Sequence, residues 1–128
     1  MLGSRNFKSF FSLFLLLGTL VGCAGSTDSS PFLGAEPAVG SVLNRAPRNL
    51  RLYFSALPDV PKSSLSLSGP GGNYDLRGFH TMGADDLMIE ITNPSIPDGD
   101  YVVTWSAVVG EDPTVHEGSY GFTVVTDR

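Results

Sequence analysis

Apolar and polar residues alternate along several short segments of the chain after residue 48. In Asn49-Leu50-Arg51-Leu52-Tyr53-Phe54 each even-numbered residue is apolar, so one side of the segment can face a core. The same period of two recurs in four further segments, at residues 64–68, 87–91, 101–107 and 120–124. This period is typical of strands that are buried on one face.

Turn-forming residues separate these segments, and no window carries a sustained helical stripe. The turn signals are Leu57-Pro58-Asp59, Gly69-Pro70-Gly71-Gly72-Asn73, Asn93-Pro94 and Pro97-Asp98-Gly99. We predict an all-β fold, an immunoglobulin-like Greek-key β-sandwich of about seven strands, with a long connection over residues 69–86.

The N-terminal part reads as an export signal and a tether. Residues 10–21 are rich in Phe, Leu and Val and follow Arg5 and Lys8, but they are too few to span a bilayer as a permanent helix. Leu20-Val21-Gly22-Cys23 resembles the bacterial lipobox, in which the cysteine receives a diacylglycerol and the leader is cut before it. We therefore expect a lipoprotein signal peptide at 1–22, the lipidated Cys23 and a flexible tether at 23–34, and one β-sandwich domain at 35–128. The alternative makes Cys23 a small residue beside an ordinary cleavage site.

The charge of the chain limits its partners. The full chain has a formal charge of -5, and loss of Arg5 and Lys8 with the leader leaves six basic against thirteen acidic residues. Such an acidic domain repels nucleic acid, so we expect no nucleic-acid binding and a membrane contact made by acyl chains alone. With Cys23 acylated, no cysteine remains for a disulfide or a thiolate metal site.

Four motifs carry a family resemblance. They are Pro37-x-x-Gly40, Pro47-x-x-Leu50-x-Leu52-x-Phe54-Ser55, Pro97-x-Gly99-x-Tyr101-x-Val103-x-Trp105 and Gly118-x-x-x-Phe122-x-Val124. In order and spacing this set resembles the CopC family of periplasmic copper-binding domains over about residues 36–125. The resemblance implies an immunoglobulin-like sandwich, in which Trp105 is a core residue.

The resemblance also implies a Cu(II) site at the loop before the last strand. Proteins of the family bind Cu(II) through a histidine at the mature N-terminus, its amine, and an Asp-x-His pair, and such nitrogen and oxygen donors suit this ion. Here Asp112 matches the aspartate, whereas Thr114 occupies the histidine position and His116 comes two residues later. Cys23 would begin the mature chain and supplies no imidazole. Asp112 and His116 are thus candidate metal ligands, against the alternatives of a solvated loop and of a partly packed strand position for His116.

A second candidate site is the pair His80 and Met82. Some CopC relatives hold Cu(I) through a methionine-rich loop in this region, because thioether sulfur suits the monovalent ion. The alternative is an ordinary exposed connection.

Nothing in the sequence points to catalysis. Only two histidines are present, neither in a Gly-x-Ser-x-Gly setting, and Gly69-Pro70-Gly71-Gly72 is followed by no lysine and no helix pattern. We predict that the chain is not an enzyme.

Two functions remain open. The first is a lipid-anchored CopC-like domain for copper binding, homeostasis or resistance in the periplasm or at the cell surface, which passes copper to an envelope partner such as a copper importer. The second is a non-metal immunoglobulin-like interaction module tethered through Cys23. In a two-membrane bacterium the outer membrane is favoured, because Ala24 is not the aspartate associated with inner-membrane retention.

Overall fold

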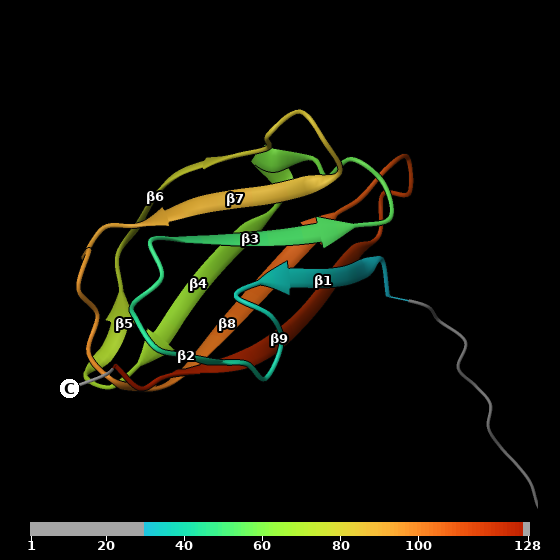
Figure 1. The fold of residues 1–128 in the computed structure, drawn as a ribbon. Helices are drawn as coiled ribbons and strands as arrows, with labels where there is room; N and C mark the ends of the chain where they lie inside the picture. Colours follow the sequence, from blue (N-terminus) through green and yellow to red (C-terminus); the bar gives the residue numbers. More distant parts are fainter. Residues whose placement is uncertain (1–29, 127–128) are drawn as a thin grey trace, which may run out of the picture.

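Two β-sheets packed face to face make up the domain (Figure 1). The computed structural model describes residues 30–126, and within them the secondary structure is strands and one short 3-10 helix, η1 (Val60–Lys62). The prediction of an all-β sandwich is confirmed.

The four-stranded sheet has the order β1-β3-β7-β6, with every pair antiparallel. Its strands are β1 (Phe32–Glu36), β3 (Asn49–Phe54), β7 (Asp86–Ile91) and β6 (Leu76–His80). The alternation noted in residues 49–54 places Leu50, Leu52 and Phe54 in the core. The alternate residues Asn49, Arg51 and Tyr53 therefore lie on the outer face of the sheet.

The five-stranded sheet has the order β2-β9-β8-β4-β5, and only β2 runs parallel to its neighbour. Its strands are β2 (Val42–Leu43), β9 (Val115–Val124), β8 (Gly99–Val108), β4 (Ser64–Gly69) and β5 (Gly72–Tyr74). The β8–β9 hairpin is paired without a break from Gly99↔Val124 to Val108↔Val115.

Trp105 on β8 is buried in the core between the two sheets, where it packs against Phe32 and Phe54. Its ring centroid lies 5.4 Å from that of Phe54 in an edge-on arrangement and 5.5 Å from that of Phe32 in a stacked one. Gly118 is its cross-strand partner, and a Cβ atom at that position would lie 2.8 Å from Cζ2 of the indole. The missing side chain of Gly118 thus leaves the space that the indole occupies.

The predicted long connection over residues 69–86 is wrong, because it contains β5 and β6. Gly69 pairs with Gly72 across a tight turn, so the chain folds straight back as β5. Both strands are short and contain glycine, and for this reason they carry no clear alternating pattern. Likewise β1 begins at Phe32, inside the range 23–34 expected as tether, and Phe32 and Ala35 pack against the core.

The predicted signal peptide at 1–22 and Cys23 lie outside the described residues. Within residues 30–126 there is no helix of the length and apolarity that crossing a membrane requires.

We expect Gly118→Ala to destabilise the domain by about 2 kcal/mol, because the added methyl group would overlap the Trp105 ring. Gly34→Ala is the matched control in β1, where nothing lies within 4 Å of the new Cβ atom. Urea unfolding followed by tryptophan fluorescence measures both. Equal midpoints for the two variants would contradict this packing of Trp105.

Candidate metal-binding sites

Asp112 lies in the connection between β8 and β9, directly after the turn at Gly110 and Glu111. Its Oδ1 accepts a hydrogen bond from the backbone N–H of Thr114 at 2.9 Å. That N–H is the main reason why the pKa of the Asp112 carboxyl is lower than usual, and the nearby His116 lowers it further. The side chain is more than half exposed, so it is a solvated carboxylate held in a fixed turn.

His116 lies on β9 opposite Ala107 and is 28% exposed, so it is a partly packed strand residue, as its shared parity with Tyr120 and Phe122 indicates. Its Nε2 is 3.8 Å from Oδ2 of Asp112. The structure therefore brings these two candidates together. No third His, Cys, Asp or Glu joins them as a metal-binding cluster within residues 30–126.

The start of β1 belongs to the same end of the sandwich as this pair. The Ser55 N–H donates to the carbonyl of Pro31, and the Gly110 N–H donates to the carbonyl of Leu57. The connection after β3 thus links the beginning of β1 to the β8–β9 loop, and Figure 1 shows both at one end of the molecule. Thr114 is exposed in this loop and has no nitrogen donor in its side chain, so the pair offers one carboxylate and one imidazole.

A bulge in β6 sets the direction of His80. Arg77 faces Glu90 on β7 in ordinary register, but the pairing then shifts so that His80, not Phe79, faces Met88. Gly78 lies between them with a φ of +74°, a conformation that glycine adopts without strain. The extra residue turns Phe79 toward the core and His80 to the outer face.

The ring of His80 is held by its own strand. Nδ1 contacts the backbone carbonyl oxygen of Gly78, which only accepts hydrogen bonds, so Nδ1 carries the proton. In the neutral ring Nε2 then has a free lone pair, and it faces Sδ of Met82 at 3.3 Å. In this tautomer neither atom has a hydrogen to share, so two metal-donor atoms face each other on an exposed surface.

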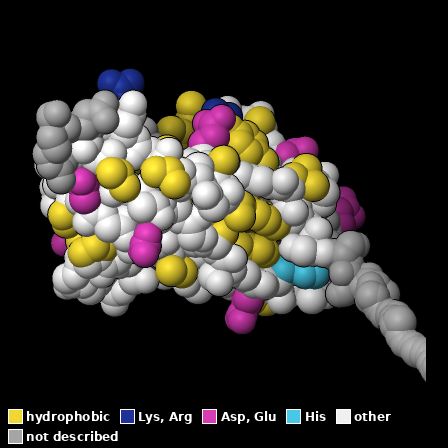
Figure 2. Space-filling view, turned by 60° about the horizontal axis from the view of Figure 1, so that its bottom comes forward, with side chains coloured by type: hydrophobic (Ala, Val, Ile, Leu, Met, Phe, Trp, Pro, Cys, Tyr) yellow, Lys and Arg dark blue, Asp and Glu magenta, His cyan; other side chains and the backbone are white. Residues whose placement is uncertain are grey.

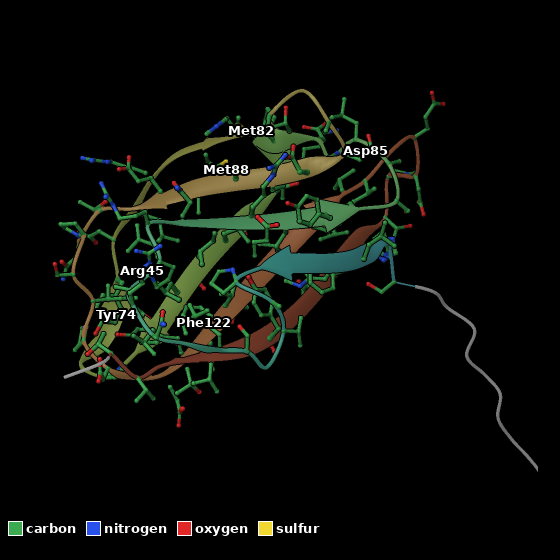
Figure 3. All side chains as sticks on the ribbon, in the orientation of Figure 1. Arg45, Tyr74, Met82, Asp85, Met88 and Phe122 are labelled. Carbon is green, nitrogen blue, oxygen red and sulfur yellow. The ribbon has the colours of Figure 1, made fainter. Side chains whose placement is uncertain are left out.

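Asp86 fixes the backbone that carries Met82. This fully buried carboxylate accepts the Met82 N–H at 2.9 Å through Oδ1 and Nε of Arg51 at 2.7 Å through Oδ2. Met82 is 52% exposed, so its backbone is held while its thioether remains open to solvent. Figure 3 shows Met82 and Met88 on the same side of β7.

Met88 was not among the site residues predicted from the sequence. The strand period predicts that Met88 points outward on β7, because its neighbours Leu87 and Ile89 point into the core. Its place opposite His80 depends on the bulge at Gly78, for which the sequence has no comparable signal.

The comparisons with known proteins agree with this architecture. The model of the CopC domain family matches residues 32–125, which is most of the chain. The protein belongs to the CopC family. Proteins of this family are not enzymes, as expected for this chain from the sequence. No curated protein gives a significant match to the chain.

Solved CopC-type structures share the fold. CopC from Methylosinus trichosporium OB3b is 23% identical over 76% of this chain and 94% of its own, with a TM-score of 0.65. PcoC from Escherichia coli, described as a methionine-rich copper resistance protein, is 25% identical over 73% of this chain and 96% of its own, with a TM-score of 0.66. A selenomethionine form of PcoC matches at 25% identity and a TM-score of 0.65, over 73% of this chain and 98% of its own.

We expect the Asp112 carboxyl to titrate below its usual range in carbon-detected NMR, and to stay below it in His116→Ala, because the Thr114 N–H is the larger cause. The pKa of Asp112 is lower in the folded protein than in the unfolded one, so the ionised carboxylate stabilises the fold at pH values above the unfolded-state pKa. This stabilisation is lost as the pH falls through the folded-state pKa. A normal Asp112 pKa in His116→Ala would show that the histidine, not the turn, sets it.

We expect Gly78→Ala to cost about 1 kcal/mol and to remove the nuclear Overhauser contact between the His80 ring and the Met82 methyl group, because alanine resists this backbone conformation. Gly40→Ala is the control, with the same φ of +74° and open space around its Cβ atom. It should lose similar stability and keep the contact. Loss of the contact in both variants would mean that general destabilisation, not the bulge, moves His80.

Proposed function

We propose that this CopC-domain protein handles copper in the cell envelope and binds it as Cu(I) at His80, Met82 and Met88. The observation that carries the proposal is the approach of Nε2 of His80 to Sδ of Met82 at 3.3 Å, with the ring proton held on the opposite nitrogen. A monovalent soft cation placed between these lone pairs would replace an unfavourable contact by two donor bonds.

Met88 supplies a third donor of the same kind. It faces His80 across the β6–β7 ladder, so both side chains project from the outer face of the four-stranded sheet. A set of one imidazole and two thioethers favours Cu(I) over Cu(II) and over zinc. The description of PcoC as methionine-rich supports this choice, although the loop of the present chain contains one methionine, and Met88 comes from the adjacent strand.

The loop between β8 and β9, which joins two strands of the five-stranded sheet, is proposed as a degenerate Cu(II) site. The 3.8 Å approach of His116 to Asp112 supports it, because an imidazole nitrogen and a carboxylate oxygen are donors that Cu(II) accepts. Thr114 replaces the histidine of the family pattern, and the predicted mature N-terminus brings no imidazole. We therefore propose that Cu(II) binds there more weakly than Cu(I) binds at His80.

The cellular setting follows from the leader. We propose that the protein is exported, acylated at Cys23, held on a membrane by its acyl chains, and exchanges copper with an envelope partner such as an importer. CopC family membership supports export, because proteins of this family are periplasmic or exported. The competing function is a tethered interaction module without metal. It predicts that the protein binds no copper, whereas the proposed function predicts that it does.

A Cu(I) titration of a soluble form that begins at an acetylated Ala24 tests the proposal, with a chromophoric chelator as competitor under reducing conditions. We expect a Kd tighter than about 1 μM, which corresponds to roughly -8 kcal/mol. Met82→Leu should weaken binding at least tenfold, because leucine keeps the volume and removes the sulfur. His116→Ala should leave the Cu(I) affinity unchanged.

Two outcomes would overturn the Cu(I) assignment. No binding tighter than micromolar in the acetylated protein would favour the interaction module. Binding that is lost in His116→Ala and kept in Met82→Leu would place copper at the β8–β9 end. The acetyl group removes the free amine that the truncation would otherwise add as an artificial ligand.

A further inference from the structure

A broad groove of about 930 Å³ lies on the outer face of the four-stranded sheet, beside the proposed copper site. Its walls come from the end of β1, from β2 and the connection to β3, and from outward residues of β3 and β7. Arg45, Arg48 and Arg51 line it together with Asn49, Glu36 and Met88.

Positive charge is concentrated at this groove. Residues 30–126 contain five basic side chains, Arg45, Arg48, Arg51, Lys62 and Arg77, and three of them line the groove in a chain of net charge -5. Figure 2 shows acidic side chains spread over one face of the molecule, with basic ones only along its upper edge. The groove is thus a local exception on an acidic protein.

Two of these arginines are available to a ligand. Arg45 and Arg48 are exposed and have no acidic side chain within 4 Å among residues 30–126. The charge of Arg48 acts at longer range and helps to lower the pKa of Glu90, after the larger effect of Arg77. Arg51 uses Nε for Asp86, and Glu36 is the one carboxylate in the lining. Guanidinium groups of this kind bind carboxylates through paired hydrogen bonds.

Apolar side chains lie between the charged ones. Pro37, Val42, Pro47 and Met88 belong to the lining, and Val42 is 69% exposed. A single small anion would use the guanidinium groups and leave these surfaces wet. An extended segment with alternating acidic and apolar side chains would contact both.

The groove and the proposed copper site share a row of residues across the sheet. Glu36 pairs with Arg51, Arg51 with Met88, and Met88 with His80, so the row crosses all four strands. Directly opposed residues in antiparallel strands project to the same face. Met88 is therefore both a wall of the groove and a proposed copper ligand.

We infer that this groove docks an acidic, extended segment of a partner protein that exchanges copper with the site at His80, Met82 and Met88. The inference rests on the proposed function for its purpose, but apart from Met88 the residues that line the groove bind no metal in that proposal. Because acidic side chains outnumber basic ones outside the groove, an acidic partner would be repelled elsewhere and guided to one orientation here. In that orientation the partner reaches Met88.

The test uses the metal-free protein beginning at acetylated Ala24 and a short fluorescent peptide in which glutamate alternates with leucine. Fluorescence anisotropy at low salt should show binding, and the Arg45→Glu, Arg48→Glu double variant should weaken it at least tenfold. Arg48→Glu alone should also weaken it. Lys62→Glu, with the same change in charge outside the groove, should bind like the parent protein. Peptides with glutamine in place of glutamate should not bind.

Methyl NMR of the same protein shows where the peptide lies. That protein contains only Met82 and Met88, and we expect the Met88 methyl signal to shift on peptide addition. The inference is overturned if Lys62→Glu weakens binding as much as Arg48→Glu, or if Met88 does not respond. It is also overturned if phosphate, citrate or anionic phosphatidylglycerol vesicles bind through Arg45 and Arg48 while the peptide does not. Because no copper is present, failure of the Cu(I) titration and failure of this test remain separate results.

Discussion

The buried carboxylate of Asp86 connects β3 to the loop between β6 and β7 at the outer face of the four-stranded sheet. Asp86 has no solvent contact, and a charge in that position is tolerable only when its oxygens have partners. Arg51 of β3 binds one oxygen, and the backbone of Met82 binds the other. The same group therefore orients a wall of the basic groove and the chain segment that carries a proposed copper donor. Loss of this carboxylate would disturb both.

The two candidate sites differ in the donor atoms that they offer. At the β8–β9 loop the fold, the turn and the aspartate are present, but Thr114 provides no imidazole and His116 provides it from a partly packed strand position. At β6–β7 a bulge, a fixed histidine tautomer and an anchored loop bring nitrogen and sulfur together. A common fold thus leaves the choice of donor atoms to local backbone geometry.

Much of the fold was predictable, because a period of two in residues 49–54, 87–91 and 101–107 directly reports which side chains enter the core. The proximity of Asp112 and His116 was also readable from their short separation around a turn. The direction of His80 was not, because one glycine with positive φ reverses the alternation for the residues that follow. Strands β1, β5 and β6 were not predicted for a related reason. They are short, each contains a glycine, and their pairing with neighbouring strands defines them.

The sheet edges are unusually poor templates for further pairing. The five-stranded sheet ends in β2 and β5, of two and three residues, while its ten-residue strands β8 and β9 lie inside. In the other sheet both edge strands, β1 and β6, have irregular register. Unpaired backbone groups on long regular edges promote association between copies of a protein. Under the proposed attachment to a membrane, copies of the protein would meet at high local concentration, and short or irregular edge strands would help them to stay separate.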